Sequence, residues 1–430
     1  MKRGIVISNE LQALIVERAL GEAGVERAGG VQLSKKDLSR VARAVIGLSD
    51  HFNRIGEPLR GDYMEKEIYR RAYLLYYMGA SFAKAATVLS ELLETSAFQG
   101  SPPRAPNRQA GRKPLSVLDV GSGPGGTSLG ALDVMMRLHE PSGLRFTAMD
   151  KSRRALDDYE FFMRARAEAA NRRQGSQSDE AEPVKVDISS IETSIETAGF
   201  SNGCWDIILL ADTLNELFSA SADPAASRAA FLMRLAAGLT DEGSLVVIEP
   251  SLKATSRSLM ALRDTIAAAP DLYIGAGCLT AQPCPMLADA RGRDWCHAGA
   301  HWMRPAVVRQ IDMAAGRKKH ILKFSYLVIQ RRPAQPVEAP DGMTAFRVVG
   351  DLRREKGRCR IMLCGEAGCR TAMLLKRDLR ESNKTILNVQ RGDIIAMDAW
   401  DERNDGWRLG TATRVEILRS FNWTGLSQPH

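Results

Sequence analysis

Apolar residues recur every three or four positions in the first part of the chain, which is typical of helices that bury one face. The segment 68–78 shows this period clearly, and its tyrosines are interpreted as packing residues rather than as a platform for stacked bases. Gly79 is predicted to end this helix, and Ser81 to cap the next one. The sequence therefore predicts a helical N-terminal domain with its linker over residues 1–110.

The pattern changes after a linker rich in Pro, Gly and Arg at residues 99–113. Short apolar strands now alternate with helical segments, as expected of a parallel sheet with right-handed crossovers. This predicts an α/β, Rossmann-like domain over residues 111–332. The predicted strands are Leu115–Val120, Leu144–Asp150, Val184–Asp187, Trp205–Ala211, Ser244–Glu249 and the late strand Lys323–Ile329.

A second linker, Pro333–Gly342, separates this domain from a last region with a different pattern. Short apolar runs there alternate with turn residues, for example Phe346–Val349 and Ile394–Met397. This alternation is typical of short antiparallel strands. The sequence therefore predicts a small C-terminal β domain over residues 340–430.

Composition narrows the class of protein. The chain has 430 residues, of which 44% are hydrophobic and 26% charged, as in ordinary globular proteins. We expect no membrane span, because no apolar run is long enough, and the N-terminus lacks the pattern of a signal or transit peptide. We therefore expect a cytoplasmic protein. The formal net charge of +8 favours a polyanionic partner such as nucleic acid.

The first predicted strand runs into the glycine loop Gly121-Ser122-Gly123-Pro124-Gly125-Gly126 and then into a helix. Such a loop lets a ligand approach the backbone, and a carboxylate after the second strand is placed to bond ribose hydroxyls. The loop resembles the first motif of class I S-adenosylmethionine-dependent methyltransferases, and residues 209–217 resemble their fourth motif. A dinucleotide-binding domain is the alternative. The predicted cofactor-binding residues are Asp119, Gly121, Ser122, Gly123, Gly125, Asp150, Asp187 and Asp212.

Six of the seven cysteines fall in the last part of the chain, which indicates a metal site rather than disulfides. Cys278, Cys284 and Cys296 lie in a proline-punctuated insertion, residues 271–305, whose thiolates can wrap a metal centre. Most iron–sulfur clusters need a fourth thiolate, and Cys364 is our candidate. The alternative fourth ligands are Cys359 and Cys369.

Two other interpretations of these cysteines stay open. Structural zinc with His297 or His301 as a ligand is the main competitor, although the paired Cys-x-x-Cys of a zinc ribbon is absent. Ordinary buried thiols are the other.

Several strings of residues extend the resemblance over most of the chain. The more specific are Trp295-Cys296-His297 and Lys323-Phe324-Ser325-Tyr326, and others are Phe82-Ala83-Lys84-Ala85 and Asn215-Glu216-Leu217. With them, the chain resembles the methyltransferase-like assembly factor of the mitochondrial small ribosomal subunit and its bacterial relatives. The resemblance implies S-adenosylmethionine binding, a [4Fe–4S] cluster and contact with small-subunit ribosomal RNA. The cluster ligands it implies are Cys278, Cys284, Cys296 and Cys364.

The catalytic residues are unknown at this stage. After the fourth strand the chain reads Asp212-Thr213-Leu214-Asn215, without the prolines of adenine-N6 enzymes or the cysteine of cytosine-C5 enzymes. Two hypotheses follow: a ribosomal RNA methyltransferase, or a non-catalytic ribosome-assembly factor with a structural metal site. For RNA contact we single out the basic runs 317–320 and 353–358.

Overall fold

The computed structural model describes residues 4–21, 26–27, 31–52, 63–94, 113–138, 142–175, 183–200, 204–288, 292–317 and 320–420. The chain divides into two compact units: unit 1 comprises residues 1–249 and 300–322, and unit 2 comprises residues 250–299 and 323–422. The predicted linker at 99–113 lies outside the described residues except for Lys113. The predicted division into three domains stays a prediction. No described helix has the length and apolar character needed to cross a membrane.

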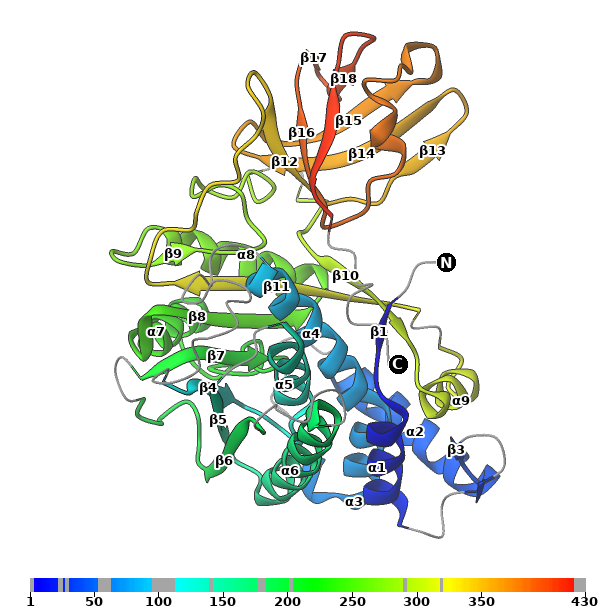
Figure 1. Cartoon of the computed structure of the whole chain (residues 1–430), viewed down its shortest axis with the longest axis vertical. Helices are drawn as coiled ribbons and strands as arrows, with labels where there is room; N and C mark the ends of the chain where they lie inside the picture. The colour runs from blue at the N-terminus through cyan, green and yellow to red at the C-terminus, as the bar shows by residue number, and fades with distance from the viewer. Residues whose placement is uncertain are drawn as a thin grey trace. The chain divides into compact units, whose positions relative to one another are not determined.

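Parallel strands form the core of unit 1 (Figure 1). They lie in the order β6, β5, β4, β7, β8, so that their carboxyl ends meet along one edge. The side chains Ile207–Leu210 in the middle of β7 are fully buried, as expected for a parallel sheet covered on both faces. The predicted α/β sheet is thus confirmed. The bounds are β4 (Leu115–Val120), β5 (Gly143–Asp150), β6 (Lys185–Glu192), β7 (Trp205–Ala211) and β8 (Leu239–Pro250).

The helices between these strands are α5 (Gly126–Leu138), α6 (Arg153–Gly175) and α7 (Pro224–Ala237). Helix α5 packs closely on α4 (Met78–Glu94), as Figure 1 shows. A Cβ atom at Gly130 would lie 2.4 Å from the Phe82 carbonyl oxygen, so this contact requires a residue without a side chain. Through this contact α4 lies against the helix that follows the glycine loop.

The N-terminal helices differ from the prediction at one point. Helix α3 (Glu67–Ala72) continues through the π-helical turn η3 (Tyr73–Tyr77) directly into α4, so the predicted helix end at Gly79 is wrong. Ser81 is a buried residue of α4 and does not cap a helix. A Cβ at Gly79 would lie 3.0 Å from Ile7 Cδ1, so glycine serves tight packing here, and burial outweighs its low helix propensity.

One buried carboxylate joins three helices of unit 1. Asp158 of α6 is fully buried and accepts hydrogen bonds from Arg18 Nε at 2.8 Å and from Arg70 Nε at 2.6 Å. Arg18 belongs to α1 (Asn9–Leu20) and Arg70 to α3. Because an unpaired buried charge is costly, this ion pair fixes α1 and α3 on α6. The other elements of unit 1 are β1 (Ile5–Val6), β2 (Glu26–Arg27), β3 (Val31–Gln32), α2 (Lys35–Phe52), η2 (Tyr63–Glu65), β10 (Ala298–Met303) and α9 (Ala306–Ala314).

Unit 2 combines helix α8 (Lys253–Ala267) with a second sheet. The sheet runs in the order β17, β18, β15, β14, β12, β16, β19, and β13 pairs with β14. Its core contains Phe346 and Trp407, whose ring centroids lie 4.9 Å apart. The bounds are β12 (Thr344–Val348), β13 (Arg353–Glu355), β14 (Arg358–Gly365), β15 (Gly368–Leu375), η5 (Lys376–Asp378), η6 (Lys384–Leu387), β16 (Ile394–Met397), β17 (Trp400–Arg403), β18 (Gly406–Leu409) and β19 (Val415–Arg419).

The remaining pairing in unit 2 joins β9 (Tyr273–Ile274) to β11 (Ile321–Gln330) in antiparallel register. The boundaries between the two units fall within three strands: after Glu249 in β8, before Ala300 in β10 and after Leu322 in β11.

Candidate functional site

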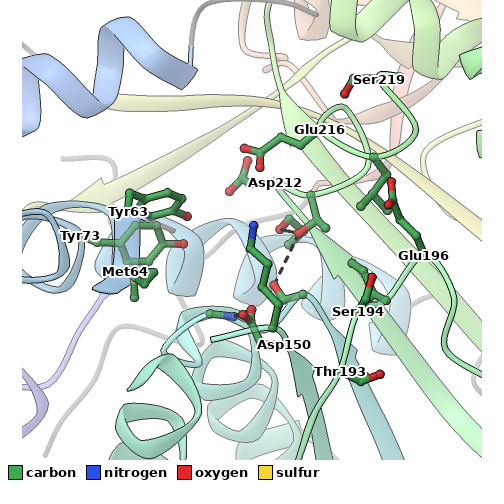
Figure 2. Close-up of a pocket in the computed structure, with 17 residues that line it drawn as sticks. Tyr63, Met64, Tyr73, Asp150, Thr193, Ser194, Glu196, Asp212, Glu216 and Ser219 are labelled. Atoms are coloured by element: carbon green, nitrogen blue, oxygen red, sulfur yellow. Dashed lines mark hydrogen bonds between the residues drawn. The ribbon is translucent and has the colours of Figure 1, made fainter. Parts of the chain in front are cut away.

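A cavity of about 320 Å³ lies at the carboxyl edge of the parallel strands of unit 1. In Figure 2, Tyr63, Met64 and Tyr73 lie on one side of it, and Thr193, Ser194 and Glu196 lie on the other. Asp150, Asp212 and Glu216 lie between these two sides. The other lining residues are Gly121, Gly123, Lys151, Ile195, Ala211, Thr213, Leu217 and Ser219.

The glycine loop forms the part of the cavity next to β4. Gly121, Gly123 and Gly125 have φ angles of +70°, +51° and +91°, a region that favours glycine. A Cβ atom at Gly121 would lie 2.7 Å from Thr213 Oγ1, so a side chain there would also clash. Gly121 and Gly123 line the cavity, whereas Ser122 is buried and, like Gly125, does not belong to the lining.

Asp150 joins the end of β5 to the glycine loop. Its Oδ2 accepts a hydrogen bond from the Gly123 N–H at 2.8 Å, and its Oδ1 accepts one from the Ser152 N–H at 2.9 Å. These backbone donors fix the carboxylate at the cavity. The same bonds hold the loop in place, so Asp150 both lines the cavity and fixes the loop beside it.

Asp119 lies behind the loop and outside the lining of the cavity. It is 1% exposed, and its Oδ2 accepts a hydrogen bond from the Ser128 hydroxyl at 2.6 Å. Burial raises the pKa of this carboxyl to about 7, with Asp150 acting in the same direction and the Ser128 hydrogen bond opposing both. Asp119 therefore ties β4 to α5 and supports the loop from inside.

Asp212 follows β7 in an unusual backbone conformation. Its φ is +53°, and its N–H donates to the Ile248 carbonyl oxygen at 2.7 Å. Its carboxylate forms an ion pair with Lys84 of α4, whose side chain is only 12% exposed. A non-glycine residue with positive φ is strained, and such residues cluster at functional sites. The predicted site residue Asp212 thus lies in the cavity, with its charge opposed by Lys84.

Glu216 and Glu249 are acidic groups near Asp212 to which the sequence assigned no role. Loss of hydration within the cavity raises the pKa of Glu216 to about 7; Lys151 opposes this shift, whereas Asp212 and Asp150 add to it. Glu249 ends β8, is 1% exposed and accepts a hydrogen bond from the Leu214 N–H at 2.8 Å. Burial raises its pKa to about 8, again with a contribution from Asp212. Glu216 therefore places a carboxyl with a raised pKa in the cavity, whereas Glu249 is not among the lining residues.

Aromatic side chains form one wall of the cavity. Tyr63 and Tyr73 line it, and their ring centroids lie 6.1 Å apart. Tyr73 opens the π-helical turn η3, and such turns often occur at functional sites. Burial raises the pKa of Tyr73, so this phenol stays neutral. The tyrosines of segment 68–78 were predicted as packing residues, and Tyr73 is also exposed to the cavity.

Asp187 lies at the other end of its strand. The prediction that it ends the third strand is wrong, because β6 continues to Glu192. Asp187 is paired in register with Arg145, and its carboxylate lies 3.3 Å from Lys185 Nζ. Strand β6 is at the edge of the parallel set, where a half-exposed strand tolerates aspartate. The residues that follow it, 193–196, line the cavity instead.

Unit 2 brings together the cysteines that the sequence singled out. Cys284, Cys296, Cys364 and Cys369 pack on a small core made of Met260, Met286 and Val349, and Cys296 interacts electrostatically with Cys278, Cys284 and Cys364. Burial raises the pKa of Cys296 to about 12 and raises those of Cys278 and Cys284. Cys359 lies in the other core, with Phe346 and Trp407.

Helix α8 organises the segment that carries these thiols. Arg263 is 3% exposed, donates to the carbonyl oxygens of Thr280 and Gln282, and interacts electrostatically with Cys278. Its neighbour Asp264 accepts the Cys284 N–H at 2.9 Å. Arg263 Nε is buried without a hydrogen-bond partner. A buried cation with an unused donor therefore lies beside the thiols.

The described residues form no binding site for a single metal ion. In the described part of the chain, no group of three or more His, Cys, Asp and Glu side chains is arranged to hold a metal ion. His297, the alternative ligand, interacts instead with Arg391, Lys323 and Asp351. The metal ligands therefore stay predictions.

A comparison with models of protein families identifies a family that the chain matches. The model of the family described as mitochondrial small ribosomal subunit Rsm22 matches residues 69–393. None of the curated proteins matches the chain.

Solved structures show weaker likenesses. The plantazolicin methyltransferase BpumL in complex with SAH is 12% identical, with 75% of this chain and 100% of that chain covered and a TM-score of 0.30. A putative S-adenosylmethionine dependent methyltransferase from Listeria monocytogenes is 16% identical, with 38% of this chain and 55% of that chain covered and a TM-score of 0.21. TM-scores this low support no inference about chemistry. Such inferences therefore rest on the residues of the cavity and of the thiol cluster.

Proposed function

The chain belongs to the mitochondrial small ribosomal subunit Rsm22 family, and on this premise we propose that it is an S-adenosylmethionine-binding, methyltransferase-like protein that acts on small-subunit ribosomal RNA or on its assembly. The observation that carries this proposal is the cavity in which the glycine loop, Asp150 and Asp212 meet. A cytoplasmic location stays a prediction.

The cavity fits a nucleoside with a charged tail. The backbone of Gly121 and Gly123 leaves room for close approach, and the Asp150 carboxylate suits ribose hydroxyls. When bound, S-adenosylmethionine supplies a methyl group on a sulfonium. Asp212 and Glu216 place negative charge and a titratable carboxyl in the same cavity, which suits a cationic ligand.

For the thiol cluster we propose a [4Fe–4S] centre on Cys278, Cys284, Cys296 and Cys364. The four thiols interact with one another, and Arg263 and Arg347 place positive charge beside them. The unused Arg263 Nε fits an anionic metal–thiolate group. A four-iron cluster spreads its ligands over a larger body than a single ion does. Cys359 is an unsuitable fourth ligand, because it is buried in the other core.

A non-catalytic assembly factor is the second candidate. It is favoured by two features of Asp212. Its carboxylate forms an ion pair with Lys84, and the sequence around it, residues 212–215, lacks the catalytic motifs of adenine-N6 and cytosine-C5 enzymes. A structural metal site, zinc or iron–sulfur, would then serve stability alone.

Methyl transfer separates the two candidates. Purified protein, prepared anaerobically, is incubated with S-adenosylmethionine labelled on its methyl group and with immature small-subunit particles. We expect label in the ribosomal RNA if the protein is an enzyme. Cofactor binding with no label in RNA or protein would assign it to the second class, and failure to bind the cofactor would refute the proposal.

A basic surface in unit 2 is our proposed RNA contact. Arg353, Arg354 and Lys356 are exposed on the β13–β14 hairpin, and the Lys376 N–H donates to the Gly357 carbonyl oxygen at 2.8 Å, which places a further lysine beside the turn. Only Glu355 opposes this charge within the hairpin, and it pairs with Arg358 at 2.5 Å. In the other predicted run, Lys318 and Lys319 lie outside the described residues.

We expect salt to weaken RNA binding steeply, because phosphate contacts release counterions. Replacing Arg353, Arg354 and Lys356 together by Ala should reduce the log–log salt slope by about 2–3, since each contact contributes roughly 0.7–0.9. The measurement is RNA binding across a salt series.

The matched control for this prediction removes the same charge elsewhere. Arg164, Arg172 and Arg403 are also exposed, with side chains 58%, 70% and 61% accessible. Their triple Ala variant should keep the wild-type slope. Equal slopes for the two triple variants would show that the hairpin is not the contact.

A further inference from the structure

Two cysteines lie directly opposite each other at the end of the β14–β15 hairpin. Cys364 and Cys369 are partners in antiparallel register, one step from the Gly365–Gly368 pair beside the turn. Both residues are partly exposed.

This arrangement suits a disulfide. Residues directly opposite on antiparallel strands have Cβ atoms about 4.5–5.5 Å apart. A disulfide needs a Cβ separation of roughly 3.5–4.5 Å. The two strands at the hairpin end therefore have to approach by about 1 Å or less, which needs no change of register or topology.

The same pair belongs to the thiol cluster of unit 2. Cys364 interacts with Cys278, Cys284 and Cys296, and Cys369 packs on the same small core. Cys369 and burial both raise the pKa of Cys364. A fifth thiol thus lies in register opposite one of the four proposed ligands.

We propose that Cys364 and Cys369 are a redox modification site at which a peroxide forms a disulfide that withholds Cys364 from the metal centre. One thiol attacks the peroxide O–O bond, giving a sulfenic acid and releasing water. The other thiol then displaces the sulfenic oxygen as a second water, forming the S–S bond. In total, two thiols and hydrogen peroxide give one disulfide and two waters. The metal part of the proposal rests on the proposed function.

The two uses of Cys364 exclude each other, because a sulfur in a disulfide has no thiolate to donate. Bound metal therefore protects the pair from oxidation, and the disulfide prevents reloading. Because the bond is reversible, the pair also protects Cys364 from further oxidation to a sulfinic acid, which thiol reductants do not reverse.

The test uses full-length, metal-free protein treated with hydrogen peroxide at stoichiometric amount. Both cysteines lie in one tryptic fragment, residues 361–370, because arginine precedes it at 360 and ends it at 370. We expect the wild-type fragment to lose two hydrogen atoms in mass and to resist alkylation. Anaerobic loading with iron and sulfide should then fall at least fivefold, and a phosphine reductant should restore it.

Matched variants identify the residues responsible. C369S should load iron like wild type when reduced. After several equivalents of peroxide, its loss of loading should not be reversed by the phosphine, because an unpaired thiol oxidises on to the sulfinic acid. C204S removes an exposed cysteine of unit 1 and should behave as wild type in every step.

Several outcomes would overturn the proposal. One is alkylation of both thiols in the fragment after peroxide. Another is equal metal loading of oxidised and reduced wild type, and a third is failure of reduced C369S to load iron, which would make Cys369 a ligand. The fragment mass is read on metal-free protein. A disulfide in a protein that takes up no metal in either state would therefore refute the proposed metal centre while confirming the modification.

Discussion

Substitution of Cys296 by serine is expected to abolish iron binding and to destabilise unit 2. Cys296 interacts with Cys278, Cys284 and Cys364, so it is the thiol on which the proposed ligand set converges. Its backbone is held on both sides: the carbonyl oxygen accepts the Ser325 hydroxyl at 2.8 Å, and the N–H donates to Met260 Sδ at 3.4 Å. A serine there keeps this backbone position but offers no thiolate.

Iron and sulfide analysis of anaerobically prepared protein measures the effect. We expect about four of each per wild-type chain and less than about one in the variant. The unfolding temperature should fall as well, because the free energy of metal binding contributes to folding. Wild-type protein with stoichiometric zinc and no iron would assign a zinc site instead.

Cys359→Ser is the matched control for this experiment. It also replaces a buried thiol by a hydroxyl, but in the core that contains Phe346 and Trp407. We expect it to lose stability, because a buried hydroxyl has to be desolvated, and to keep its iron. Loss of iron in both variants would show only that unit 2 has unfolded.

Substitution of Asp150 by alanine is expected to weaken S-adenosylmethionine binding roughly 10- to 100-fold, since a hydrogen bond to a charged group contributes about 1.5–3 kcal/mol. Two effects add up. The carboxylate that faces the cavity is lost, and the Gly123 and Ser152 N–H groups lose their acceptor. The loop then becomes less ordered in the free protein, which raises the entropic cost of binding.

Isothermal titration calorimetry checks this prediction, with Asp187→Ala as the control. Each variant removes one aspartate from a strand of the same sheet: Asp150 from β5 and Asp187 from β6. Asp187 lies 3.3 Å from Lys185 at the opposite end of β6, so its loss should leave the affinity unchanged. An Asp187→Ala variant that binds as weakly as Asp150→Ala would contradict this placement of the cofactor, as would a preference for a nicotinamide dinucleotide.

The parallel sheet was predictable because its signals are local. Residues 115–120 and 205–211 are mainly apolar, and the strands found there have the predicted bounds. The third strand was harder, because three of the five residues in its second half, 188–192, are polar and the strand lies at the sheet edge. The predicted helix end at Gly79 was wrong for a related reason. This glycine is required by close packing on Ile7, a residue far away in the sequence.

Only those parts of the candidate site that belong to a sequence motif were predictable. The glycine loop and Asp150 are adjacent to strands that the pattern identified, and both line the cavity. Tyr63 and Glu216 reach the same cavity, but only the tertiary structure shows this. The strained backbone of Asp212 and its ion pair with Lys84 involve residues from different helices and strands, and no spacing along the chain reveals them.

The order of the cysteines along the chain has a consequence for protein synthesis. Ribosomes add about 5–20 residues per second, so Cys278, Cys284 and Cys296 are made several seconds before Cys364 and Cys369. Until β14 and β15 exist, the first three thiols have no fourth partner. A metal centre built on Cys364 is therefore completed only after residue 364 has been translated, and chains that end before it are left without the centre.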